Sequence, residues 1–220
     1  MKSAGLFSWI LVLAGLVLWS PTAAADGPYK PGEPVVFRGK VTDGQGQPVT
    51  GVAVVLNVSR NAFKVRRLSR ETTDTLWIPG TTGADGVYEI AWRWDKYYNV
   101  FELKVALQVR RDGRDTYQVF YEVDLTGNVL QGSPIEFPIV LEDTRELETL
   151  RDFLASIQSE DEKRIYHEVG LPDRIDGAKA DYDPDRSWWY FAAGKVYRFR
   201  GGALDLVETF EPVPLTGALP

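Results

Sequence analysis

The single histidine and the missing cysteines limit the chemistry that this chain can carry out. The 220 residues include one histidine, His167, and no cysteine. Thiol chemistry, disulfide bonds and zinc sites built from cysteine and several histidines are therefore excluded. A serine triad would need His167 as its base, but no G-x-S-x-G turn supplies a nucleophile. The sequence predicts a protein without a catalytic site, a metal or a cofactor.

The acidic segment DYDPDR, which contains Asp181, Asp183 and Asp185, begins like a calcium-binding loop. Such a loop needs glycine at its sixth position and glutamate at its twelfth. Those positions hold Arg186 and Ala192, so we interpret the segment as a solvated loop. A hydrolase that uses two carboxylates stays open as an alternative function, because spatial pairing among 31 acidic residues cannot be read from a sequence.

The segment SWWYFAAGKVYRF, residues 187–199, is typical of a β-hairpin with aromatic side chains on both faces. Alternation along a strand points Trp188 and Tyr190 to one face and Trp189 and Phe191 to the other. One pair is expected beneath helices. The other pair shares its face with Arg198, where either the N-terminal module or a partner would cover it. The sequence does not decide which pair faces outward.

Tryptophan, tyrosine and arginine are the residue types that dominate the energetics of protein–protein interfaces. We therefore predict contact with a protein partner of the cell envelope through Trp188, Trp189, Tyr190 and Arg198. Burial between the two modules of the chain is the competing interpretation of the same residues.

A basic segment, RNAFKVRRLSR at positions 60–70, interrupts an otherwise acidic chain. Its cationic residues are Arg60, Lys64, Arg66, Arg67 and Arg70. Such a local reversal of charge favours an anionic partner, so a module that binds anionic glycan or lipid is the alternative function. The competing interpretation is a solvated, strand-like loop whose charges pair with the protein's own acids.

The first 25 residues have the organisation of a secretory signal peptide. Lys2 precedes an apolar run from Leu6 to Trp19, and the alanines that end at Ala25 form a cleavage pattern. Cleavage is expected after Ala25 and gives a periplasmic or secreted protein of the bacterial envelope, without an anchor but with membrane contact still open. The chain has 25 basic residues, so loss of Lys2 leaves 24 against 31 acidic residues. This balance argues against nucleic-acid binding.

Alternation with a period of two dominates residues 26–142 and predicts a β-sandwich domain. The clearest strands lie within 101–109 and 117–125, and weaker strands are expected at 35–42, 52–59, 87–94 and 135–141, with one more within 63–78. About seven strands without a helical period indicate a two-sheet, immunoglobulin-like sandwich. The same alternation points Trp92 and Trp94 into its core.

Two segments of this region resemble the carboxypeptidase-regulatory-like, transthyretin-like family of β-sandwiches. GKVTDGQGQPVTGVAVVL and TTGADGVYEI match the family pattern at Gly39, Val41, Asp43, Gly46, Pro48, Gly51, Val54, Leu56, Asp85, Gly86 and Tyr88. The resemblance covers about half of the mature chain and implies a structural or adhesive module. The long insert between Val58 and Thr81 departs from the family.

After Leu141 the period becomes helical, which predicts an α+β domain over 143–211, followed by a flexible tail at 212–220. Capping-box patterns begin two helices at Asp143 and Ser159, and Gly170 with Pro172 ends the second. A three-stranded antiparallel sheet is expected from strands at 187–192, 195–200 and 203–210. The expected fold class of the whole chain is therefore mainly β.

The C-terminal third resembles the small helix-helix-sheet domains of outer-membrane assembly lipoproteins and the related β-lactamase-inhibitor-like fold. The matching positions are Gly170, Pro172, Asp173, Trp188, Trp189, Tyr190, Phe199, Gly202 and Leu204. The resemblance implies contact between proteins in the envelope rather than catalysis. The chain departs from these lipoproteins because it has no cysteine to carry a lipid.

Overall fold

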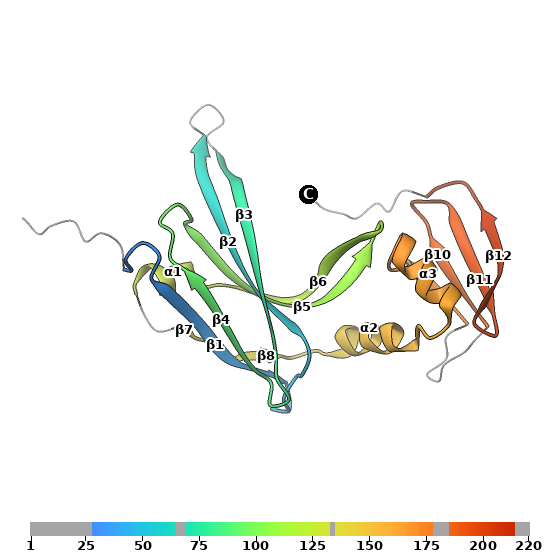
Figure 1. Ribbon diagram of the computed structural model, residues 1–220, viewed down its shortest axis with the longest axis horizontal. Helices are drawn as coiled ribbons and strands as arrows, with labels where there is room; N and C mark the ends of the chain where they lie inside the picture. Colours follow the sequence, from blue (N-terminus) through green and yellow to red (C-terminus); the bar gives the residue numbers. More distant parts are fainter. Residues whose placement is uncertain (1–27, 65–68, 133–134, 178–184, 214–220) are drawn as a thin grey trace, which may run out of the picture.

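The computed structural model describes residues 28–64, 69–132, 135–177 and 185–213 (Figure 1). Strands account for 53% and helices for 16% of the described residues, so the prediction of a mainly β fold is confirmed. Two four-stranded sheets form an N-terminal sandwich, and a third sheet with two helices forms the C-terminal module. The expected signal peptide lies outside the described residues, as does the tail from residue 214 onward.

The first sheet of the sandwich is built around one central strand. Its members are β1 (Pro34–Asp43), the antiparallel β4 (Val87–Arg93), and the parallel β7 (Ile135–Glu136) and β8 (Ile139–Leu141). The sequence predicts one strand where β7 and β8 lie. Pro138 separates them because proline has no N–H group to donate to the ladder.

The second sheet has the order β3-β2-β5-β6 and is antiparallel throughout. Its members are β2 (Ala53–Lys64), β3 (Ser69–Thr81), β5 (Val100–Arg111) and β6 (Arg114–Asp124). β2 and β3 project from the sandwich as a long hairpin (Figure 1). The described part of the basic segment therefore belongs to paired strands, in line with the strand expected within 63–78 and with the strand-like loop of the competing interpretation.

Apolar side chains from the two sheets meet in one core. On β4 and just after it, Tyr88, Ile90, Trp92 and Trp94 are all buried, while the alternate residues of β4 are exposed. From the second sheet, Phe101 packs against Trp92 and Trp94, with ring centroids 5.5 and 5.8 Å apart. The prediction that both tryptophans face inward is confirmed, since alternation assigns a whole face of the strand to the core.

Turns of the transthyretin-like pattern have clear physical roles in this fold. The Asp43 carboxylate accepts the N–H of Gln47 at 2.8 Å and closes the turn after β1, where Gly46 has a φ of 81°. At Gly86, with a φ of 77°, a Cβ would lie 2.6 Å from the backbone oxygen of Val41. Only glycine fits both the conformation and the space at this position.

The short helix α1 (Thr126–Leu130) is not indicated by the sequence. Its five residues cover little more than one turn, so no helical period can be read from them. The backbone N–H of Thr126 donates to the Asp124 carboxylate at 2.8 Å, and the Val129 side chain is buried in the sandwich core. Tertiary packing therefore stabilises a helix that is too short to be stable alone.

The C-terminal module combines two helices with a sheet of order β12-β11-β10-β9. Its elements are α2 (Arg145–Ser156), α3 (Glu160–Val169), β9 (Arg174–Asp176), β10 (Arg186–Tyr190), β11 (Lys195–Arg200) and β12 (Ala203–Thr209). The three predicted strands are present. β9 adds a fourth strand, which corrects the three-stranded prediction, because three residues are too few to show alternation.

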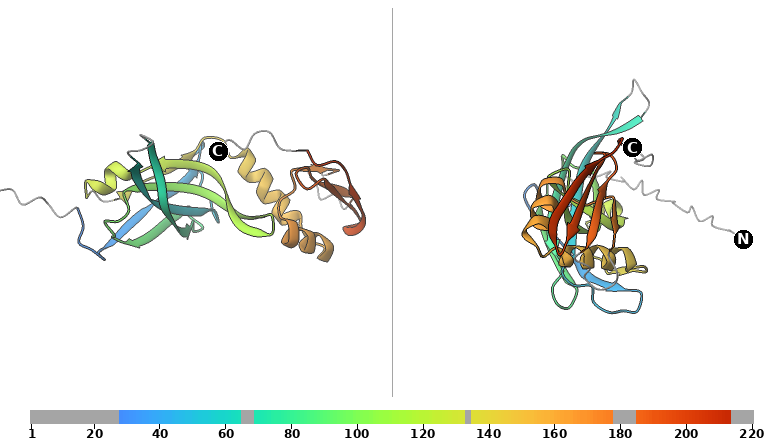
Figure 2. Two further views of the ribbon diagram at one scale, coloured as in Figure 1. Left: turned by 90° about the horizontal axis from the view of Figure 1, so that it is seen from above. Right: turned by 90° about the vertical axis from the view of Figure 1, so that its right-hand side faces the viewer.

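The two modules touch through the tip of the β5–β6 hairpin as well as along the chain (Figure 1; Figure 2, left). The Arg110 N–H donates to the Tyr166 hydroxyl at 2.9 Å, and the Leu171 N–H donates to the Arg110 carbonyl at 2.7 Å. At Gly170, with a φ of 99°, a Cβ would lie 2.5 Å from that carbonyl oxygen. The hairpin therefore reaches across the boundary that the sequence places at residue 142.

Candidate functional site

The C-terminal sheet buries one aromatic pair of β10 beneath the helices. Trp188 is fully buried and Tyr190 nearly so, in a cluster with Ile165 of α3 and Phe199 of β11. The Trp188 ring lies 4.8 Å from the Phe199 ring and 5.4 Å from the Phe153 ring on α2, measured between centroids. This face of the sheet is therefore the core of the module.

The prediction that Trp188 and Tyr190 contact a partner is wrong. The Trp188 side chain has no exposed surface, and the Tyr190 hydroxyl donates to the Gly170 carbonyl at 2.8 Å. Burial raises the pKa of the Tyr190 phenol, and nearby groups add to the shift. Both side chains stabilise the fold and are not available for contact.

The opposite face of the sheet carries the other predicted residues, and we call it the outer aromatic face. It consists of Trp189, Phe191, Val196, Arg198, Glu208 and Phe210. The Trp189 ring lies 5.8 Å from Phe210 and 6.3 Å from Phe191, so three aromatic rings form one cluster. Trp189, Phe191 and Phe210 are each half-buried, which leaves part of the cluster open to solvent.

Arg198 lies beside the aromatic cluster and is held in place by an acidic residue on β12. Its guanidinium lies 5.8 Å from the Trp189 ring centroid. Two of its nitrogens donate to Glu208 Oε2, at 2.8 and 3.0 Å. The Arg198 side chain is 42% exposed, so the charged group is oriented and still accessible. Such a paired, stacked arginine loses little conformational entropy when it binds a partner.

Sequence reasoning missed Phe210 and Glu208 as members of this face. Phe210 follows β12, and its N–H donates to the Gly194 carbonyl at 2.9 Å, which brings the ring over the turn between β10 and β11. The Val213 N–H donates to the Phe191 carbonyl at 3.0 Å and continues this pairing. The signal for Phe210 is its place at the end of the predicted alternating strand 203–210, one residue beyond the observed end of β12.

The outer aromatic face points away from the sandwich. Figure 2, right, looks onto the sheet, and none of the described helices lies in front of it. The helices and, beyond them, the sandwich lie on the other side of the sheet (Figure 1). The competing interpretation, in which the sandwich covers the second aromatic pair, is therefore wrong.

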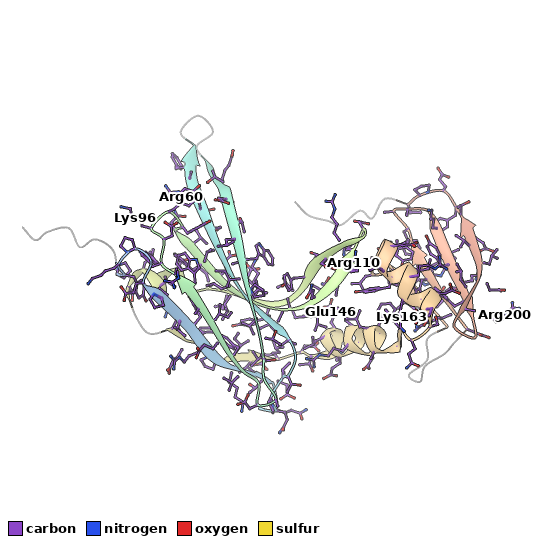
Figure 3. All side chains as sticks on the ribbon, in the orientation of Figure 1. Arg60, Lys96, Arg110, Glu146, Lys163 and Arg200 are labelled. Atoms are coloured by element: carbon purple, nitrogen blue, oxygen red, sulfur yellow. The ribbon has the colours of Figure 1, made fainter. Side chains whose placement is uncertain are left out.

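The structure describes only part of the basic segment. The Arg60 guanidinium donates to the Tyr97 carbonyl at 3.0 Å and lies 5.5 Å from the centre of the Tyr97 ring; Figure 3 labels it near Lys96. Arg66 and Arg67 lie outside the described residues, and Lys64 and Arg70 are described only as backbone partners within β2 and β3. Anion binding by the segment stays a prediction.

No catalytic arrangement emerges from the residues that the structure describes. His167 is exposed on the last turn of α3, and no group of three histidine or acidic residues in the described ranges could hold a metal ion. Asp181 and Asp183 lie outside these ranges, and the Asp185 carboxylate accepts the Gly201 N–H at 2.7 Å. None of the helices described is long and apolar enough to cross a membrane.

No protein-family model matches the chain, and no curated protein matches its sequence. Among solved structures, a 9R-lipoxygenase from Cyanothece PCC8801 is similar over 50% of this chain and 16% of its own, with 18% identity and a TM-score of 0.33. A likeness this low supports no argument about fold or function. The two family resemblances in the sequence therefore stay predictions.

Proposed function

We propose that this chain is an exported, non-catalytic binding protein of the bacterial envelope, which contacts a protein partner through its outer aromatic face. The observation that carries the proposal is the position of Trp189 and Arg198. Both lie on the one face of the C-terminal sheet that no described helix covers. The predicted signal peptide supports export.

The composition of the face fits a protein interface better than a catalytic site. Interfaces concentrate their binding energy in a few tryptophan, tyrosine and arginine residues surrounded by a polar rim. Here Trp189 and Arg198 are central, and Leu206 on the neighbouring edge strand is 45% exposed. A partner that covers this face would bury the remaining surface of the aromatic cluster and leave the Arg198–Glu208 pair desolvated but satisfied.

The experiment is affinity capture from an envelope extract of the source organism with three forms of residues 26–220. The wild type is compared with Trp189→Ala and with Trp77→Ala, a matched control that removes a tryptophan 41% exposed on the sandwich. The expected result is a specific protein retained by the wild type and by Trp77→Ala and lost with Trp189→Ala. Retention by folded Trp189→Ala would refute the outer aromatic face as the contact.

An anionic surface is the second candidate partner, and one observation favours it. Phe63 is 58% exposed on β2, close to the end of the projecting hairpin and beside the basic residues of segment 60–70. Exposed aromatic residues beside cationic ones are typical of protein segments that bind membrane surfaces. The hairpin would then place the phenylalanine at the headgroup level.

Vesicle sedimentation tests this second candidate. The mature chain is mixed with phosphatidylglycerol vesicles or with phosphatidylcholine vesicles, and Arg66→Glu/Arg67→Glu serves as the variant. Binding to the anionic vesicles alone, weakened by salt and by the variant, is expected. Equal binding to both lipids, or equal binding by the variant, would remove the candidate. Interaction through the outer aromatic face should persist at high salt, which separates the two functions.

A further inference from the structure

A groove of about 520 Å³ lies where the sandwich meets the C-terminal module. One wall is the β5–β6 hairpin, the second is α2, and the third is the segment that follows α3 and leads into β9. The lining residues that matter here are Arg111, Glu146, Leu150, Phe153, Leu171 and Asp173. Its volume falls within the range of about 300 to 1,000 Å³ that small-molecule sites occupy.

Apolar side chains from two elements contribute to the lining of the groove. Leu150 and Phe153 come from α2, where they also pack against the sandwich core and the C-terminal core, and Leu171 comes from the segment after α3. All three are half-buried, so they keep surface that a ligand can cover. Burial of such apolar surface on binding is favourable. The groove therefore suits a ligand with an apolar body.

Charged groups of both signs line the groove from different walls. Arg111 lies on the hairpin, whereas Glu146 lies on α2 and Asp173 on the third wall; Figure 3 labels Glu146 near the hairpin. All three residues are exposed, and none of them forms a salt bridge within the described ranges. The adjacent residues Arg110 and Arg145, by contrast, do form salt bridges, with Asp115 at 3.2 Å and with Asp143.

Backbone hydrogen bonds fix the walls on which these charges lie. Arg111 forms a β-bridge with Gly170, at the start of the third wall. The Asp173 N–H donates to the Trp189 carbonyl at 2.8 Å, and one Asp173 oxygen accepts the Phe191 N–H at 2.7 Å. The hairpin wall and the third wall are therefore joined before any ligand binds, and the Asp173 carboxylate is oriented, which lowers the entropy lost on binding.

We propose that this groove binds a short apolar peptide with free termini. The peptide carboxylate pairs with the Arg111 guanidinium, whose planar donors match a carboxylate. The peptide ammonium pairs with Glu146 and the free oxygen of Asp173. The peptide side chains pack on Leu150 and Phe153. A zwitterionic ligand is the class that complements one cation and two carboxylates in separate walls.

The two carboxylates also bear on the hydrolase alternative. Glu146 and Asp173 are exposed, whereas a carboxylic acid that serves as the general acid of a hydrolase lies in an apolar pocket. One Asp173 oxygen is already occupied by the Phe191 N–H. The groove therefore fits a binding role, which is independent of the protein contact proposed for the outer aromatic face.

Isothermal titration calorimetry of the mature chain with leucyl-leucine tests the assignment. Leucyl-leucine amide lacks the carboxylate, and N-acetyl-leucyl-leucine lacks the ammonium. Arg111→Gln is compared with Arg114→Gln, a control on the same hairpin that is exposed and outside the groove lining. Circular dichroism confirms that both variants fold.

A charge-assisted hydrogen bond contributes about 1.5 to 3 kcal/mol, which corresponds to a loss of about tenfold to more than a hundredfold when it is removed. We expect Arg111→Gln to lower the affinity for leucyl-leucine by that factor and Arg114→Gln to leave the affinity unchanged. Leucyl-leucine amide should bind the wild type and Arg111→Gln with the same low affinity. Glu146→Gln should change the affinity for N-acetyl-leucyl-leucine little. Absence of leucyl-leucine binding to the wild type, or equal binding by folded Arg111→Gln, would overturn the proposal.

Discussion

Replacement of Arg186 by methionine should strongly destabilise the C-terminal module. The Arg186 and Glu162 side chains are 2% and 0% exposed, and the guanidinium lies 2.8 Å from Glu162 Oε1. Arg186 also donates to the Ser156 hydroxyl at 2.7 Å and to the Ser156 carbonyl at 2.9 Å. Methionine would fill most of the space but would leave a buried carboxylate without its cation.

Removal of one partner from a buried ion pair costs about 3 to 5 kcal/mol. In a chain of this size each kcal/mol lowers the melting temperature by about 2 to 4 °C, so we expect a loss of about 6 to 20 °C. The assay is urea and thermal unfolding of residues 26–220, followed by near-ultraviolet circular dichroism. Trp188 packs beside Arg186, with the guanidinium 5.4 Å from the ring, and reports on this region.

The double variant Arg186→Met/Glu162→Leu separates the unpaired charge from the other interactions. Glu162 also closes the capping box of α3, accepting the Ser159 N–H at 3.1 Å, so its loss costs about 1 kcal/mol by itself. The double variant should nevertheless be more stable than Arg186→Met. A loss below about 1 kcal/mol in Arg186→Met, or a double variant less stable than that single variant, would refute the reasoning.

Three further predictions concern positions elsewhere in the chain. Gly170→Ala should loosen the β5–β6 hairpin from α3 and lower the free energy of unfolding by about 1 to 3 kcal/mol, because φ at this residue is 99° and a Cβ would lie 2.5 Å from a backbone oxygen. Hydrogen exchange should then show faster amide exchange at the tip of this hairpin. Trp188→Ala should cost about 3 to 5 kcal/mol and Trp189→Ala clearly less in urea unfolding, since only the first is fully buried; equal losses would contradict this. Burial raises the pKa of Tyr88 and Tyr190 above the usual 10.0, so the stability of the fold should fall as pH rises above about 10, where the phenols of the unfolded chain lose their protons. Ultraviolet absorbance at alkaline pH should show that both tyrosines ionise only when the protein unfolds. Ionisation of all ten tyrosines near pH 10 in the folded protein would contradict this prediction.

Local patterns predicted the elements whose signals lie within a few neighbouring residues. β11 begins and ends where the alternation places it, and the capping box at Ser159 forms with Glu162. The first capping box does not form, because α2 begins one residue later and Thr144 becomes its N-cap. The Asp143 carboxylate accepts the Arg145 N–H at 3.0 Å there, so the acidic residue still stabilises the helix start. The five-residue α1 and the three-residue β9 were missed because neither is long enough for its period to repeat.

The sequence by itself determined that Trp188 and Trp189 face opposite sides of one strand, since alternation follows from backbone geometry. Only the tertiary structure decided which of them is core, because that choice depends on the side of the sheet on which α2 and α3 pack. The groove shows the same dependence. Arg111, Glu146 and Asp173 are far apart in the chain, and they line one site because the β5–β6 hairpin docks on the end of α3. Such long-range packing has no signal in a local pattern.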